Sequence, residues 1–178
     1  MGIRDEEIKR LVNYAKGLGI KTVWKTRGPK DPHATWDTQG NLIEIFVHPT
    51  DSKQFIILCF VHELAHHMGW VYSGRKADLK TYRALDAEAE RKDTDPVLAK
   101  EQRKLIYLTE KNDAVYREQI WQEIGIKVPI YKFYADRDLD IWIYYRYYMT
   151  GKWPTMKSIA RKKDFLLKKY KEEKGQSI

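Results

Sequence analysis

Residues 51–69 read DSKQFIILCFVHELAHHMG, and this stretch decides the fold that we expect. Asp51 is a favourable N-terminal cap and Gly69 a favourable C-terminal stop, so the sequence predicts a helix over residues 52–68. Apolar residues cover nearly its whole circumference, which is typical of a helix buried on all sides. We therefore expect this helix to lie at the centre of the molecule.

Three ionisable residues interrupt this apolar helix. His62, Glu63 and His66 form the motif H-E-x-x-H. Because this spacing is just over one helical turn, the two imidazoles can bind one zinc ion while Glu63 acts as the general base on a bound water. A chance match is the alternative, but unpaired polar groups inside a buried helix would cost on the order of several kcal/mol, a cost that a metal removes. The motif therefore predicts a catalytic zinc site.

The segments on both sides of this helix predict a small sheet and several further helices. Upstream, the patterns indicate a helix over residues 4–18, a strand over 20–26 and a hairpin with arms over 33–37 and 42–48. Downstream, they indicate a peripheral helix and loop over 71–95 and helices over 96–125, 138–149 and 155–171. This combination predicts an α+β fold.

The strand and helix over residues 42–68, with His-Glu-Leu-Ala-His-His-Met-Gly beginning at His62, resemble the core of the zincin superfamily. Among the small members of that superfamily, the chain is similar to the ImmA/IrrE-like intracellular peptidases. The resemblance covers residues 4–69 and, more loosely, 96–125, but not the C-terminal third. It implies a zincin-like fold, with a small sheet, a buried HExxH helix and additional C-terminal helices. It also implies zinc-dependent hydrolysis of a peptide bond in a protein or peptide substrate.

A catalytic zinc usually has three protein ligands and one open position for water. No third histidine follows Gly69 at the short spacing found in some zincins. Zincins of the Glu type instead use a carboxylate on a downstream helix, so the resemblance implies Glu110 as the third metal ligand. Asp113, one turn later, would then orient a ligand imidazole as an outer partner. Alternative third ligands are Asp113 itself and the earlier pair Glu88 and Glu90.

The other histidines are expected to have ordinary structural roles. His67 follows His66 directly and so points away from the metal face of the helix, which predicts packing or surface exposure. His33 and His48 border the predicted strands and are interpreted as surface or turn residues.

Most of the positive charge lies at the C-terminal end. The net charge is +8, and residues 152–178 contain nine Lys or Arg against three Asp or Glu. We expect a zincin-like domain over residues 1–150 and a basic helix over 151–178 that packs on it. The alternative to an enzyme is a zincin-like binding module whose basic helix binds nucleic acid or an acidic partner. Aromatic residues at helical spacing over 141–148 are interpreted as packing rather than base stacking.

Nothing in the sequence predicts a membrane protein. The first ten residues are polar and include three acidic side chains, unlike a signal peptide. The longest apolar stretch, residues 55–61, is far shorter than the roughly 20 residues that span a bilayer. The single cysteine, Cys59, has no partner for an internal disulfide. We therefore expect a cytoplasmic protein.

Overall fold

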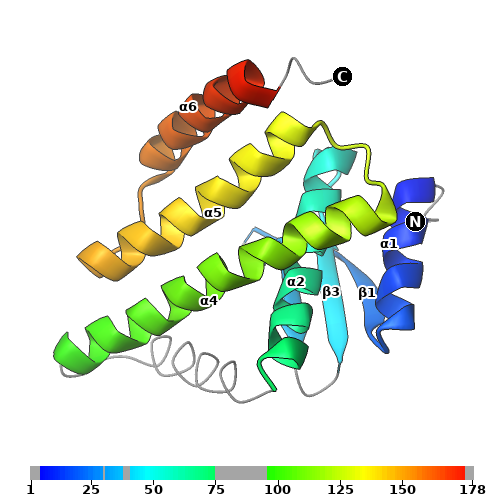
Figure 1. The fold of residues 1–178 in the computed structure, drawn as a ribbon, viewed down its shortest axis with the longest axis horizontal. Helices are drawn as coiled ribbons and strands as arrows, with labels where there is room; N and C mark the ends of the chain where they lie inside the picture. Colours follow the sequence, from blue (N-terminus) through cyan, green and yellow to red (C-terminus); the bar gives the residue numbers. More distant parts are fainter. Residues whose placement is uncertain (1–4, 30, 38–40, 75–95, 175–178) are drawn as a thin grey trace. The chain divides into compact units, whose positions relative to one another are not determined.

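The computed structural model in Figure 1 describes residues 5–29, 31–37, 41–74 and 96–174, which form five helices and three strands. In chain order these are α1 (Glu6–Gly17), β1 (Lys21–Thr26), β2 (Ala34–Asp37), β3 (Leu42–Val47), α2 (Lys53–Tyr72), α4 (Pro96–Ile124), α5 (Ile130–Thr150) and α6 (Met156–Lys174). The predicted α+β class is confirmed. The helix and loop predicted over residues 71–95 lie outside the described residues beyond Gly74, and so do Glu88 and Glu90.

The sheet is mixed, with strand order β1-β3-β2. The antiparallel pair β2 and β3 is the predicted hairpin, with Trp36 opposite Ile43. β1 pairs with β3 in parallel, so β3 is the central strand. Ile43 and Ile45 alternate with more exposed neighbours along β3 and are 0% and 1% exposed. One face of the sheet is therefore buried, as expected for a strand with period-two patterning.

Local signals define α1 clearly. The Asp5 carboxylate accepts hydrogen bonds from the backbone N–H groups of Glu7 and Ile8 at 3.0 and 3.3 Å, which is an N-terminal cap. Gly19, with φ of +77°, follows the C-terminal end in the left-handed conformation that glycine adopts at little cost. Arg10 donates to the carbonyl oxygen of Ile124 at 2.9 Å and so ties α1 to the end of α4.

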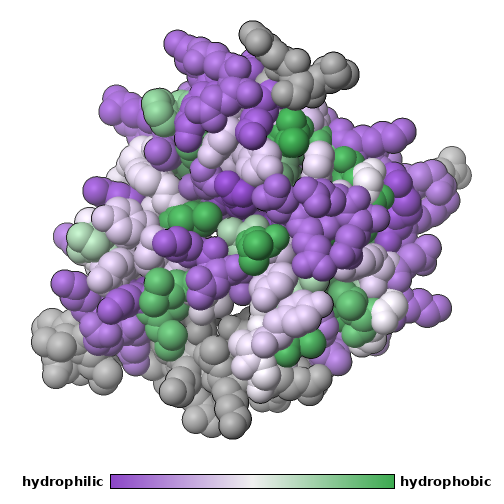
Figure 2. Space-filling view, in the orientation of Figure 1, coloured by the Kyte–Doolittle hydropathy of each residue, from purple (hydrophilic) through white to green (hydrophobic). Residues whose placement is uncertain are grey.

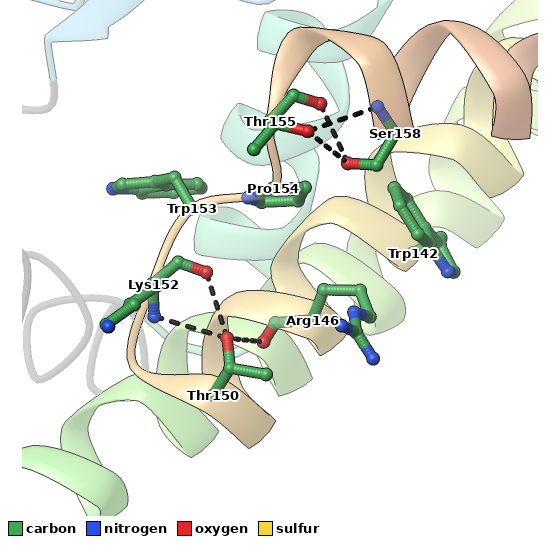
Figure 3. A pocket seen from close by; sticks show the side chains of 8 residues that line it. All are labelled: Trp142, Arg146, Thr150, Lys152, Trp153, Pro154, Thr155 and Ser158. Carbon is green, nitrogen blue, oxygen red and sulfur yellow. Dashed lines mark hydrogen bonds between the residues drawn. The ribbon is translucent and has the colours of Figure 1, made fainter.

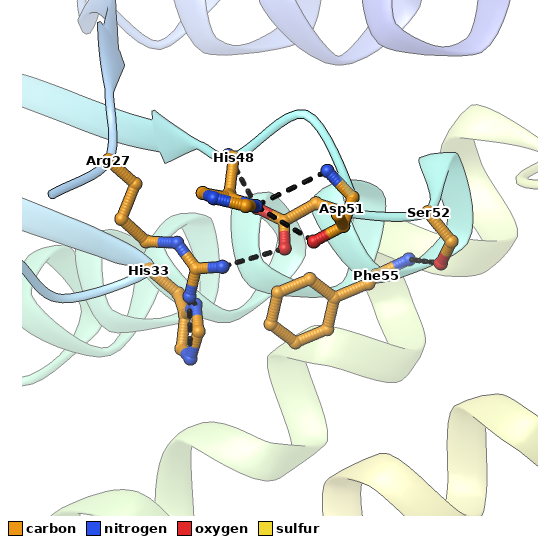
Figure 4. Close-up of polar contacts among 7 residues, drawn as sticks. Arg27, His33, His48, Asp51, Ser52 and Phe55 are labelled. Atoms are coloured by element: carbon orange, nitrogen blue, oxygen red, sulfur yellow. Dashed lines mark hydrogen bonds and ion pairs between the residues drawn. The ribbon is translucent and has the colours of Figure 1, made fainter. Parts of the chain in front are cut away.

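The start of α2 differs from the sequence interpretation. Ser52, rather than Asp51, caps the helix, because its Oγ accepts from the N–H of Phe55 at 3.2 Å. The Asp51 carboxylate instead accepts from the backbone N–H of His48 at 2.7 Å and forms an ion pair with Arg27 at 2.8 Å (Figure 4). Asp51 therefore closes the turn between β3 and α2.

The chain divides into two compact units. The first contains residues 1–68 and 115–128, and the second contains residues 69–114 and 129–178. In the first unit, the largest fully buried side chains come from α1, β3, α2 and the last part of α4: Leu11, Ile43, Ile45, Ile57, Phe60, Val61, Leu64 and Ile120. Trp24 of β1 meets Phe60 of α2 edge to face, with ring centroids 6.1 Å apart. The motif helix thus belongs to the core of this unit, as predicted.

In the second unit, α5 and α6 lie side by side (Figure 1). Their contact is built on Ala135, Leu139, Leu166 and Tyr170. The hydroxyl of Tyr170 donates to the Asp138 carboxylate. Burial, together with this carboxylate, raises the pKa of Tyr170 to about 12, which keeps the hydroxyl protonated as a donor.

α5 begins at Ile130, two turns before the predicted start at residue 138. Asp138 therefore lies inside the helix, where its carboxylate accepts the hydrogen bond from Tyr170. α4 continues to Ile124 and ends at Gly125, whose φ is +65°.

Among the described helices, none combines the length and apolar character needed to cross a bilayer.

Candidate metal centre

The two motif histidines converge on one face of α2. Their Nε2 atoms are 2.8 Å apart, and their ring centroids are separated by 4.5 Å. Both side chains are half-buried, while the helix around them is anchored by Ile57, Val61 and Leu64, each at most 1% exposed. This packing fixes the helix and therefore the direction of both imidazoles, as the motif spacing predicts.

Glu110 of α4 joins the two histidines. His62, His66 and Glu110 each offer one ligand atom, and these atoms all lie within 4.8 Å of one another, so the group could hold a metal ion. Glu110 is buried, at 7% exposure. Glu63 neighbours His62 on α2 and is half-buried, but it is not part of the group.

The chemistry of this donor set fits zinc. Bonds of about 2.0–2.2 Å in a tetrahedral arrangement separate neighbouring donor atoms by roughly 3.3 Å. The observed range, from 2.8 Å between the imidazoles to at most 4.8 Å across the group, brackets that separation. With these three donors, a tetrahedral zinc ion would have a fourth position for water, as catalytic zinc sites do.

Arg117 is a neighbour of the site that the sequence reasoning missed. It is 3% exposed, and its guanidinium contacts Nδ1 of His62. The guanidinium of an arginine can only donate hydrogen bonds, so its partner nitrogen must be an acceptor. A histidine that binds a metal through Nε2 has its hydrogen on Nδ1, and this N–H usually donates to an acceptor. Metal binding through Nε2 of His62 therefore requires Arg117 to move away from this nitrogen. The sequence spacing could have indicated this residue, because Arg117 follows Glu110 by seven residues and so lies on the same face of α4.

Asp113 also lies in a buried position, at 5% exposure, one turn beyond Glu110. Its carboxylate packs against the backbone of Gly69, where a Cβ would meet Cγ of Asp113 at 2.7 Å. Gly69 is therefore required by this close approach and is not a helix stop, because α2 continues to Tyr72. The interpretation of Gly69 as the end of the helix is wrong for this reason.

Gly69→Ala should destabilise the protein. In an open helix this change would be favourable by about 0.5–1 kcal/mol, but forcing a methyl group into an occupied site costs about 1–3 kcal/mol. We expect a net loss of about 1–2 kcal/mol in the free energy of unfolding, measured by urea denaturation. Gly17→Ala is the matched control, because nothing lies within 4 Å of a Cβ there. Equal stability of the two variants would contradict the close packing of Asp113 on Gly69.

The remaining histidines have the structural roles expected from the sequence. His67 is 4% exposed and packs edge to face on Trp36, with ring centroids 5.5 Å apart. His33 and His48 are exposed residues that line an open cavity of about 540 Å³ beside Arg27 (Figure 4). Partial desolvation, followed by the positive charge of Arg27, lowers the pKa of His33. Neither residue belongs to the metal-binding group found in the described residues.

No protein-family model matches the chain, and searches of curated proteins and of solved structures find no match.

Proposed function

We propose that this protein is a zinc-dependent metallopeptidase with a zincin-like fold. His62, His66 and Glu110 hold the zinc, and Glu63 is the catalytic general base. The observation that carries this proposal is the approach of two imidazoles and one carboxylate to within 4.8 Å of one another. Glu63 adjoins the first of these ligands in the chain. A purely structural site would have no use for this additional carboxylate.

A zinc ion held by these residues would polarise the scissile carbonyl and lower the pKa of a coordinated water. Glu63 takes a proton from the attacking water as its oxygen bonds to the carbonyl carbon. The same carboxylic acid then returns the proton to the leaving amine as the C–N bond breaks, so Glu63 ends the cycle ionised. Asp113 serves as an outer partner that limits the movement of the ligands.

The local architecture supports the zincin-like assignment. α2 follows the central strand β3 after a short turn, and the Arg27–Asp51 ion pair ties that turn to the end of β1. The motif helix is thereby held against the sheet by both covalent connection and side-chain packing. The proposed substrate is a protein or peptide, and the proposed location is the cytoplasm.

The second candidate is a zincin-like module that binds a partner and does not hydrolyse it. The positive charge of residues 152–178 favours this candidate, because clustered lysines and arginines attract nucleic acid or acidic surfaces. The two candidates differ in what a bound metal does: it is catalytic in the first and structural in the second.

The test is peptide hydrolysis by the full chain, measured on a broad library of fluorogenic peptides before and after metal removal. We expect 1,10-phenanthroline to abolish cleavage and one equivalent of zinc to restore it, because the proposed reaction needs a metal at the open site. Cleavage that survives complete metal removal would contradict the mechanism. A chain that binds one zinc but cleaves no library peptide would favour the binding module.

A further inference from the structure

The turn between α5 and α6 forms an open pocket of about 510 Å³ in the second unit (Figure 3). Trp142, Arg146 and Thr150 lie along one face of α5, since they are spaced four residues apart. The turn itself and the first residues of α6 complete the lining. The residues that define its chemistry are Trp142, Arg146, Lys152, Trp153, Thr155 and Ser158.

The backbone of this turn is held in place by specific hydrogen bonds. The hydroxyl of Thr150 lies within hydrogen-bond distance of the carbonyl oxygens of Arg146, at 2.8 Å, and Lys152, at 3.0 Å, and can donate its one hydrogen to either (Figure 3). Its oxygen accepts from the N–H of Lys152 at 3.2 Å. Gly151 adopts a φ of +67°, the left-handed conformation that reverses the chain. The pocket is therefore formed before any ligand arrives, which lowers the entropic cost of binding.

An exposed indole borders this pocket. Trp153 stacks on Tyr147 with ring centroids 4.1 Å apart and an angle of 4° between the rings, and it meets Tyr144 edge to face. Despite these contacts, 55% of Trp153 remains exposed. A rigid indole with so much surface in water is a suitable platform for stacking a flat ring.

The charges in the pocket are of one sign. Arg146 and Lys152 are both exposed, and none of the described lining residues is acidic. Residues 152–178 add a local excess of six positive charges by sequence. Figure 2 has the orientation of Figure 1, and hydrophilic residues predominate in the region of the view where Figure 1 shows α6. The surroundings therefore attract polyanions over distances comparable with the Debye length.

We propose that this pocket binds single-stranded nucleic acid, with Arg146 and Lys152 contacting phosphates and Trp153 stacking on a base. An exposed indole beside paired cations matches an unpaired nucleotide, which presents a flat ring and a phosphate together. An acidic peptide presents charge but no flat ring, and duplex DNA keeps its bases stacked inside. This inference does not depend on the peptidase proposal, because no residue of the metal centre takes part.

The test is fluorescence anisotropy of a labelled dT20 oligonucleotide titrated with the full chain between 50 and 200 mM salt. Replacing both Arg146 and Lys152 with Gln should weaken binding at least about tenfold and reduce the salt slope by about 1.4, because about 0.7 counterions are released per phosphate on a single strand. Trp153→Leu should weaken binding about tenfold while leaving the salt slope unchanged, because it removes stacking and no charge.

The matched control is the double variant Lys168→Gln and Lys171→Gln, which removes the same charge from α6 outside the pocket. It should change the affinity less than about threefold. An equal loss in this control, or no binding of dT20 by the full chain at 50 mM salt, would overturn the proposal. Tighter binding of a polyglutamate peptide, or of a duplex of the same length, would also overturn it. Circular dichroism melts of each variant confirm that folding is retained.

Discussion

Glu63→Gln is expected to reduce peptide hydrolysis by about 10²- to 10⁴-fold while one zinc stays bound. Glutamine has nearly the same shape as glutamate but cannot take a proton from the attacking water. Glu63 lies outside the group of proposed metal ligands, so its replacement leaves His62, His66 and Glu110 in place. The loss should appear in kcat rather than in substrate affinity, because proton transfer occurs only in the chemical step. The measurement is steady-state hydrolysis of the best fluorogenic peptide by zinc-loaded protein.

Glu101→Gln is the matched control, since Glu101 is an exposed glutamate on α4. It should hydrolyse the peptide at the rate of the unmodified chain. A Glu63→Gln variant that cleaves equally fast would refute Glu63 as general base. If that variant instead loses its zinc, Glu63 is a metal ligand, and the role of general base passes to another residue.

The paired histidines were predictable because their geometry is local. Residues four apart on a helix project in nearly the same direction whatever surrounds them. The structure accordingly places the Nε2 atoms of His62 and His66 2.8 Å apart. Glu110 is 44 residues beyond His66 in the sequence, so no helical period connects them. Its assignment came from a resemblance, and the structure brings one of its carboxylate oxygens into the same group.

Long-range contacts explain what the sequence did not predict. Gly69 was interpreted as a helix stop because glycine favours helix ends. The actual constraint is the Asp113 carboxylate packed against it, which only the fold reveals. Arg117 was overlooked for a related reason, because a charged residue on a long helix is usually solvated, whereas this one is 3% exposed.

The fold shows the same division between local and non-local signals. The hairpin of β2 and β3 was predicted from turn residues and from an apolar, β-branched second arm, and its antiparallel register is observed. The parallel pairing of β1 with β3 was not predicted, since strands separated in the sequence leave no local signal of their pairing. The predicted start of α5 at residue 138 is wrong, because the helix begins at Ile130. Pro129 before it makes no capping hydrogen bond through its side chain, so the true start has no local capping signal.

Removing either motif histidine should abolish stoichiometric zinc binding. Loss of an outer partner of a ligand typically weakens metal binding by about 10- to 100-fold. We expect His62→Ala and His66→Ala to weaken zinc binding by more than this, because each variant removes a direct ligand. The measurement is zinc content after dialysis, with affinity determined by competition against a chelating indicator. His67→Ala is the matched control. It also removes an imidazole from α2, but the ring of His67 packs on Trp36 and is not part of the metal-binding group. It should retain about one zinc but unfold at a lower urea concentration.

The same assay identifies the third ligand. Glu110→Gln should weaken zinc binding as strongly as either histidine variant, because the carboxylate supplies both a donor atom and the negative charge that offsets the cation. Glu88→Gln and Glu90→Gln should leave zinc binding unchanged if Glu110 is the ligand. If one of these two variants loses its zinc while Glu110→Gln binds zinc normally, the third ligand is Glu88 or Glu90 and not Glu110. Full zinc occupancy in both His62→Ala and His66→Ala would reject the metal centre as a whole.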